Sequence, residues 1–157
     1  MPEIHLICGF IGFGKTTYAK KLECELPAIR FTHDEIMVQR YGRHPDDFKL
    51  KYQIVDNFIK EETIKLINNG QNVILDYGFW SREVRKEYYN WAKSITNKVY
   101  FHSVICDIET AKKRVLKRNI DDTNELFIDE NCFDNLLDQY EPISEIEKYK
   151  IIFYNNT

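Results

Sequence analysis

The sequence lacks the features that mark membrane proteins and disulfide-stabilised secreted proteins. No apolar run approaches the roughly 18 residues that a membrane-spanning helix needs. The first residues form neither a basic segment nor a cleavable hydrophobic signal. No two cysteines stand in C-x-x-C spacing, so no zinc or redox motif is visible. The cysteines are Cys8, Cys24, Cys106 and Cys132. These absences predict a cytoplasmic protein with reduced thiols and no membrane partner.

The chain also lacks a strong net charge, internal repeats and a linker. Its formal net charge of −3 provides no overall basic field. This argues against long nucleic acids as partners but leaves a local basic groove open. A hydrophobic content of 43% in 157 residues is typical of one globular domain. We therefore expect a single domain over residues 1–157, and the sequence leaves its oligomeric state undetermined.

One stretch carries a specific motif. Residues 9–16, GFIGFGKT, match the P-loop pattern G-x-x-x-x-G-K-[ST] at every required position. With glycine at roughly 7% of residues, such a match arises by chance in about one in a few hundred chains of this size. The apolar run before it predicts a short strand, and residues 17–23 predict the first turns of a helix. Strand, glycine loop and helix together form the structural unit of this motif.

The residue types in this loop suit nucleotide phosphates. A loop without bulky side chains exposes backbone N–H groups, and the following helix adds the positive end of its dipole. Lys15 can bridge the β- and γ-phosphates of ATP, and the Thr16 hydroxyl can ligate Mg²⁺. The predicted nucleotide contacts are Gly9, Gly12, Phe13, Gly14, Lys15, Thr16 and Thr17.

Strand-like runs alternate with longer helical stretches along the chain, which predicts βαβ units and a parallel sheet. The expected strands cover about residues 3–8, 28–32, 72–76, 99–106 and 149–154. The longest expected helix, residues 48–69, has an apolar stripe and is interpreted as a packing helix.

Two carboxylates follow predicted strands, at the edge where open α/β sheets bind ligands. Asp34 can act as a general base on an acceptor hydroxyl, or it can cap a helix over residues 35–40. Asp76 ends an apolar run that resembles a Walker B strand. It is therefore a candidate for holding Mg²⁺ or for contacting the acceptor.

An aromatic loop follows Asp76. Tyr77, Phe79 and Trp80 can form a stacking wall for an acceptor ring or a hydrophobic lid over the sheet edge. Ser81 is the expected cap of the next helix. Arg82 and Arg85 in its first turns can bind an anion of the acceptor, although a solvated helix face is the favoured interpretation. His102 is expected to pack or to form hydrogen bonds rather than to catalyse.

A basic helix is predicted from about residue 108 to residue 119. Arg114 and Arg118 are four residues apart and share one face of this helix. A polar, acidic stretch follows it. Residues 114–128 therefore match the place where small P-loop kinases carry their lid, although basic residues near a helix C-terminus also complement its dipole.

Four segments, GFIGFGKTT, FTHDE, VILDYGFWSR and RVLKRN, resemble the small P-loop kinase-like proteins. This group includes zeta toxins, chloramphenicol phosphotransferase, gluconate kinase, the kinase domain of polynucleotide kinase and ATP-binding proteins of the AAA_33 type. The resemblance implies a three-layer α/β/α fold with a five-stranded parallel sheet of order 2-3-1-4-5. It also implies an acceptor-activating role for Asp34, a Walker B role for Asp76 and lid roles for Arg114 and Arg118.

The sequence departs from some members of this group. Polynucleotide kinases carry an arginine three residues after the base, where this chain has Met37, which argues against a 5′-hydroxyl nucleic-acid substrate. Adenylate kinases follow the P-loop lysine with glycine, whereas Lys15 is followed by Thr16. A complete N-K-x-D motif for guanine is absent. A motor of the AAA+ class needs an additional helical domain for which the chain is too short.

The sequence thus predicts an ATP- and Mg²⁺-dependent phosphotransferase that acts on a hydroxyl of a small molecule. Its acceptor is expected between Asp34 and the aromatic loop. The alternative acceptor is a 5′-hydroxyl of a nucleotide or nucleic acid. The alternative from another functional class is a nucleotide-binding regulatory module with little turnover.

Overall fold

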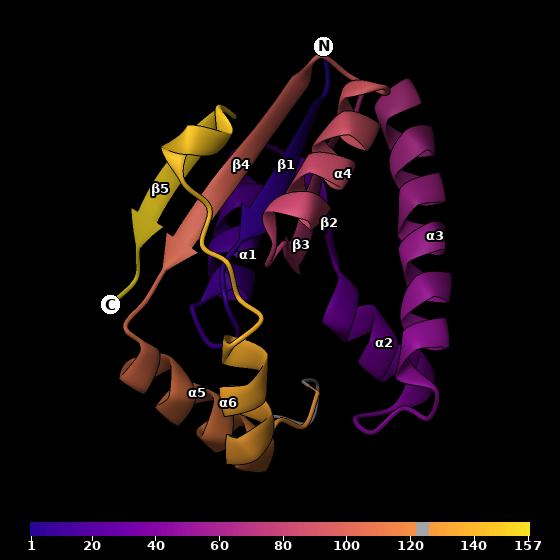
Figure 1. Cartoon of the computed structure of the whole chain (residues 1–157). Coiled ribbons are helices and arrows are strands. Elements are labelled where there is room, and N and C mark those ends of the chain that lie inside the picture. The colour runs from indigo at the N-terminus through magenta and orange to yellow at the C-terminus, as the bar shows by residue number, and fades with distance from the viewer. Residues whose placement is uncertain (122–125) are drawn as a thin grey trace.

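The chain forms a five-stranded parallel sheet with helices on both faces (Figure 1). The computed structural model describes residues 1–121 and 126–157. The strands are β1 (Glu3–Cys8), β2 (Ala28–Thr32), β3 (Asn72–Gly78), β4 (Lys98–Ile105) and β5 (Ile151–Asn155). The helices are α1 (Lys15–Glu25), α2 (His33–Tyr41), α3 (Phe48–Asn68), α4 (Arg82–Lys93), α5 (Ile108–Asp121), α6 (Glu130–Leu137) and the 3₁₀ turn η1 (Glu145–Glu147). The strand order β2-β3-β1-β4-β5 confirms the predicted fold.

Alternation along β1 divides the interior into two cores. Ile4 and Leu6 point to the side that α3 and α4 cover, where Val55 of α3 and Tyr88 of α4 are buried. Ile7 points to the opposite side, where the buried residues come from α1, α5 and α6. Because both faces of the central strand are covered, every residue of β1 from Ile4 to Cys8 is buried.

The helix boundaries correct one expectation near Asp34. Helix α2 begins at His33, and its N-cap is Thr32, which still has the extended backbone of β2. Asp34 is therefore the second residue of the helix, and the interpretation of Asp34 as an N-cap is wrong. The expected cap at Ser81 is confirmed, since its hydroxyl accepts a hydrogen bond of 3.1 Å from the Val84 N–H.

The predicted lid, residues 114–128, falls into three parts. Residues 114–121 form the last turns of α5, and residues 126–128 lead to α6. The part between them, residues 122–125, lies outside the described residues. Among the helices of the described chain, none combines the length and the apolar content needed to cross a bilayer.

The sheet order decides which loops meet. β1 lies at the centre, so the P-loop that follows it emerges from the middle of the sheet. β2 is at one edge and delivers Asp34, and β5 is at the other edge. In a parallel sheet all of these loops leave from the same end, and that end is where α/β proteins bind their ligands.

Candidate active site

The P-loop backbone follows a path that glycine permits. Gly12 and Gly14 have φ angles of 79° and 91°, in the left-handed region. A Cβ atom on Gly12 would lie 2.5 Å from the carbonyl oxygen of Ala111, and one on Gly14 would collide with the Asn156 amide. Glycine at these two positions therefore lets the loop turn sharply while α5 and the C-terminal residues pack against it.

The side chains of Lys15 and Thr16 are held at the start of α1. Lys15 Nζ donates a hydrogen bond of 3.3 Å to the Phe10 carbonyl, across the P-loop. Thr16 Oγ1 donates a hydrogen bond of 2.7 Å to Asp76 Oδ2, at the end of β3. The structure thus joins the P-loop threonine to the carboxylate of the predicted Walker B strand.

The two carboxylate oxygens of Asp76 differ in their hydrogen bonding. The side chain is 3% exposed, and Oδ2 also accepts a hydrogen bond of 3.0 Å from Thr32 Oγ1. Oδ1 is buried and has no hydrogen-bond partner in the described chain. An unsatisfied buried carboxylate oxygen is costly, and a bound cation or its hydration water would remove this cost.

These residues fit Mg²⁺. Mg²⁺ prefers oxygen ligands and is usually bound by one or two protein groups together with waters and substrate phosphates. Thr16 and Asp76 offer a hydroxyl and a carboxylate at one point beside the P-loop. In the part of the chain that the structure describes, no group of three or more histidines, cysteines or acidic residues is arranged to hold a metal ion. A site completed by nucleotide phosphates is therefore the kind of metal site that these residues suit.

Asp34 lies in α2, directly after the edge strand β2. Its side chain reaches solvent but is closely surrounded by protein atoms. This loss of hydration raises the pKa of Asp34. The adjacent His33 opposes the rise most strongly, Lys15 and Arg118 also oppose it, and Asp76 adds to it. Their influence shows that these charges lie near the carboxyl group of Asp34. A carboxyl group with a raised pKa is suited to accept a proton from a hydroxyl.

Aromatic side chains support α2 behind Asp34. The buried His33 ring stacks on Tyr52 with a centroid distance of 3.8 Å and meets the Tyr77 ring edge-on. The Tyr77 hydroxyl donates a hydrogen bond of 3.1 Å to Asp56 Oδ1, and the Tyr88 hydroxyl donates to the same oxygen. These contacts fix the orientation of the Tyr77 ring.

Sequence reasoning missed Asp56. It is 5% exposed in the middle of α3, which the sequence presented only as a packing helix. The available signal was a carboxylate within the apolar stripe, one residue after Val55 and three before Ile59. The structure shows that this carboxylate receives two tyrosine hydroxyls and an ion pair of 3.5 Å from Lys60.

The aromatic loop divides between core and surface. Phe79 is 3% exposed and packs among the rings of Tyr77, Tyr88 and Phe101. Its expected role in stacking on an acceptor is wrong, because a buried ring cannot meet a ligand. Trp80 is half-buried, with its ring 5.1 Å from that of Phe10 in the P-loop.

Arg85 has neither of the roles considered for it. Its side chain is fully buried and pairs with both carboxylate oxygens of Glu147, at 2.9 and 3.0 Å. It also donates to the carbonyls of Phe79 and Glu141, each at 2.8 Å. Burial alone would raise the pKa of Glu147, but the hydrogen bonds from Arg85 hold it below its usual value. Arg85 therefore binds the aromatic loop to the segment before β5.

Arg82 behaves differently from Arg85, although it lies only three residues away. Its side chain is exposed and lines a shallow surface depression together with Lys86, Tyr89 and Tyr149. Its backbone N–H donates to the Glu141 carboxylate at 2.6 Å. Its expected contact with the acceptor stays a prediction.

The two basic residues of α5 differ in position. Arg114 donates long hydrogen bonds of 3.4 Å to the carbonyls of Gly12 and Asn156, so it rests against the P-loop. Arg118, one turn later, contributes positive charge near Asp34 and lowers its pKa. Arg114 therefore lies beside the P-loop, whereas Arg118 acts on Asp34.

A family model described as an AAA domain, AAA_33, matches residues 4–143. The chain belongs to the AAA_33 family. It is a small P-loop kinase-like protein, as the four resembling segments predicted. No curated protein matches this AAA_33 chain significantly.

Solved structures share the fold of this AAA_33 protein at low sequence identity. Kti12 of Chaetomium thermophilum in complex with ADP-AlF3 has a TM-score of 0.75 and 17% identity, over 97% of this chain and 88% of that one. A gluconokinase from Sinorhizobium meliloti has a TM-score of 0.65 and 14% identity, over 98% and 82% of the two chains. A chain of the Pnkp1/Rnl/Hen1 RNA repair complex has a TM-score of 0.73 and 19% identity, over 90% and 48%. At such identities these likenesses establish the fold alone.

Proposed function

We propose that this protein transfers the γ-phosphoryl group of ATP to a hydroxyl of a small molecule. The observation that carries this proposal is the grouping of Lys15, Asp76 and Arg118 around the carboxyl group of Asp34. A module that only binds nucleotide needs Lys15 and Asp76. It has no use for the carboxyl group of Asp34, whose pKa is raised.

Each residue would have a distinct role. When bound, ATP and Mg²⁺ supply the phosphoryl group and neutralise part of its charge. Lys15 and the loop N–H groups would hold the phosphates, and Thr16 and Asp76 would hold Mg²⁺. Asp34 would accept the proton of the acceptor hydroxyl, while Arg118 would stabilise charge that develops during transfer.

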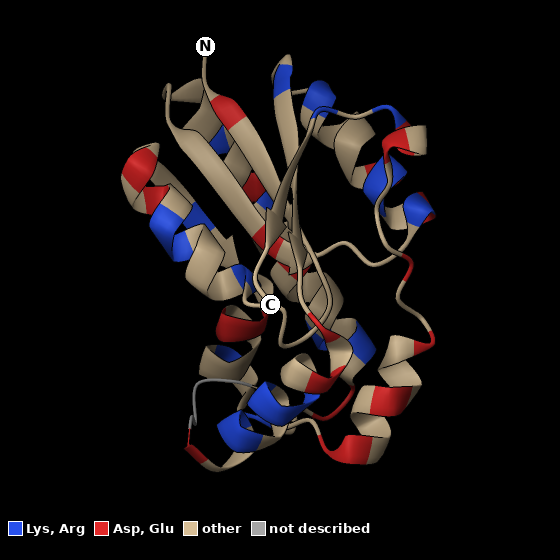
Figure 2. Ribbon diagram, turned by 90° about the vertical axis from the view of Figure 1, so that its left-hand side faces the viewer, with Lys and Arg blue, Asp and Glu red and all other residues tan. Residues whose placement is uncertain are grey.

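A small acceptor is favoured over a nucleic acid. Met37, at the position where polynucleotide kinases have arginine, is fully buried and cannot contact a phosphate backbone. Positions of Lys and Arg are interspersed with positions of Asp and Glu along the ribbon in Figure 2. The 5′-hydroxyl acceptor is kept as the second candidate because a chain of an RNA repair complex shares the fold.

A phosphoryl-transfer screen tests the proposal. The purified protein would be given labelled ATP and Mg²⁺ with sugars, nucleosides, antibiotics and 5′-hydroxyl oligonucleotides. We expect label transfer to at least one small hydroxyl compound. Lys15→Ala should reduce ATP affinity or turnover by at least about tenfold, since charge-assisted phosphate contacts contribute about 1.5–3 kcal/mol. ATP binding without transfer to any acceptor would favour the regulatory module.

A further inference from the structure

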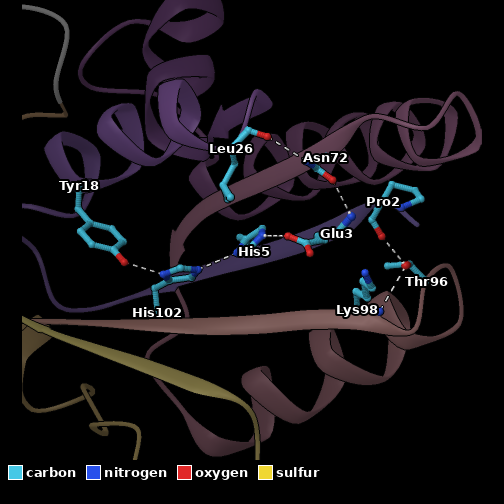
Figure 3. Close-up of polar contacts among 9 residues, drawn as sticks. All are labelled: Pro2, Glu3, His5, Tyr18, Leu26, Asn72, Thr96, Lys98 and His102. Atoms are coloured by element: carbon cyan, nitrogen blue, oxygen red, sulfur yellow. Dashed lines mark hydrogen bonds and ion pairs between the residues drawn. The ribbon is translucent and has the colours of Figure 1, made fainter.

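A chain of polar side chains runs beneath α1 on one face of the sheet (Figure 3). Tyr18 of α1 contacts His102 Nδ1 at 2.6 Å, and His102 Nε2 contacts His5 Nδ1 at 2.7 Å. His5 Nε2 then contacts the Glu3 carboxylate at 3.0 Å. Both histidines are buried, at 1% and 4% exposure.

The Glu3 carboxylate at the end of this series of hydrogen bonds determines which atom donates in each of them. The Glu3 carboxylate can only accept, so His5 Nε2 carries a proton. Burial lowers the pKa of both histidines, that of His102 to about 3, so each ring is neutral at neutral pH and has one accepting nitrogen. His102 Nε2–H must then donate to His5, and the free acceptor His102 Nδ1 must receive the proton of Tyr18. Burial also raises the pKa of Tyr18, so the hydroxyl keeps this proton to donate.

Because the Tyr18 hydroxyl donates its proton to His102, it can only accept a hydrogen bond from any other group. Its proton is committed to His102, so the oxygen has only lone pairs to offer to another group. In the described residues, no donor is recorded for this oxygen. Tyr18 is thus an acceptor that cannot turn its hydrogen outward without breaking a buried hydrogen bond.

Tyr18 lines a pocket of about 200 Å³ that begins at the P-loop. Gly14 and Thr17 line this pocket at the phosphate loop, and Tyr154 and Asn156 line it on the β5 side. Along α1 the lining continues with Lys21, Leu22 and Glu25. The Tyr18 and Tyr154 rings lie 5.1 Å apart and present an aromatic surface.

The sheet order indicates which part of a nucleotide this pocket would take. The P-loop follows the central strand, Asp34 follows the edge strand β2, and the pocket adjoins the opposite edge strand β5. With phosphates on the P-loop and the acceptor at Asp34, the β5 side is left for the nucleoside. An aromatic wall suits a planar base.

We propose that Tyr18 determines nucleotide specificity by accepting a hydrogen bond from the 6-amino group of a purine base. This inference rests on the proposed function, since it requires a triphosphate on the P-loop. It predicts that a 6-amino purine is favoured over a 6-oxo purine, whose oxygen would face another acceptor.

Binding of three triphosphates tests the inference without any acceptor. Calorimetry with ATP, inosine triphosphate and purine riboside triphosphate compares an amino group, a carbonyl oxygen and a hydrogen at position 6. One neutral hydrogen bond corresponds to about three- to tenfold in affinity, so we expect ATP to bind that much more tightly than purine riboside triphosphate. Inosine triphosphate should bind at least as weakly as purine riboside triphosphate.

Two variants isolate the role of the hydroxyl. Tyr18→Phe keeps the ring but removes the acceptor, so ATP and purine riboside triphosphate should bind equally. Tyr100→Phe is the matched control, because Tyr100 lies on the same sheet face against His5 but does not line the pocket. It should keep the ATP preference. His102→Leu frees the Tyr18 proton to point outward, which should shift the preference toward inosine triphosphate.

The outcomes separate this inference from the proposed function. A Tyr18→Phe variant that keeps the full ATP preference overturns the inference, while Lys15-dependent ATP binding leaves the phosphotransferase intact. Failure of all three triphosphates to bind overturns the proposed function and the inference with it. If His102→Leu does not fold, as circular dichroism would show, Tyr18→Phe still decides the question.

Discussion

Asp34 is the single residue whose chemistry separates a phosphotransferase from a nucleotide-binding module. It is not the N-cap of α2, and its side chain forms no hydrogen bond with the residues that the structure describes. Its raised pKa results from lost hydration and from Asp76, against the opposing charges of Lys15 and Arg118. A carboxyl group without structural partners in a charged cleft is therefore available for chemistry.

Replacing Asp34 with Asn should separate catalysis from folding. Asn keeps the size of the side chain but removes its charge and basicity. We expect phosphoryl transfer to fall by about 10²–10⁴-fold, the usual contribution of a general base, while ATP affinity stays within about threefold. Transfer kinetics and calorimetry on the same preparation are the measurements. Transfer at the wild-type rate would show that positioning and electrostatics suffice without this base.

At the scale of elements, α5 carries two arginines with different surroundings. Arg114 contacts the P-loop carbonyl of Gly12, and Arg118 acts on Asp34 one turn further along. The helix therefore reaches both the P-loop and the surroundings of Asp34.

This difference predicts different kinetic effects of the two α5 variants. Arg118→Ala should lower kcat more than it weakens ATP binding, because its charge acts on Asp34, the proposed general base. Arg114→Ala should mainly weaken ATP binding, since it supports the loop. Steady-state kinetics with varied ATP would distinguish them. If both variants have normal kinetics and only a lower unfolding midpoint, the two arginines do no more than complement the helix dipole.

Two other elements, α4 and η1, are joined by a buried ion pair. Arg85 and Glu147 have side-chain exposures of 0% and 4%, and their contact joins residues 62 positions apart. Two carbonyl groups complete the hydrogen bonding of the guanidinium. Removal of either partner would leave a charge buried without compensation.

The Arg85→Ala variant should therefore lose about 3–5 kcal/mol of unfolding free energy. Arg82→Ala is the matched control on the same helix. Its side chain is exposed, so its unfolding free energy should change by less than about 0.5 kcal/mol. Urea denaturation of both variants measures the difference. Equal losses would indicate that the buried pair contributes no more than a surface charge.

At the scale of the whole molecule, the buried histidines make stability dependent on pH. The pKa values of His5 and His102 are lowered by burial, so these rings are neutral in the folded state. In the unfolded chain they titrate near 6.5. Below that pH the unfolded state binds more protons than the folded state, so stability is complete above about pH 6.5 and falls on acidification.

Acid titration of stability should reveal this effect. Between pH 7.5 and pH 5, the loss of unfolding free energy caused by His102 alone should be about 2 kcal/mol. His102→Gln cannot be protonated, so its unfolding free energy should fall less over the same interval by about this amount. Urea denaturation at both pH values, for wild type and variant, gives the comparison. An equal fall in both proteins would mean that His102 is protonated in the folded state.

The sequence by itself determined the P-loop, the five strands and the identity of the charged cleft residues. These features depend on interactions over short distances along the chain. Glycine permits the backbone path of the loop, short apolar runs mark the strands, and Lys15 and Thr16 follow the loop directly. The strand order came from the resemblance, and the structure confirmed it.

Only the tertiary structure decided which side chains meet across the chain. Arg85 pairs with Glu147, Asp56 receives the hydroxyl of Tyr77, and the acceptor role expected for Phe79 gives way to burial. The His5–His102 contact spans 97 positions. No local pattern encodes such pairs, because they depend on how strands and helices pack after the chain has folded back on itself.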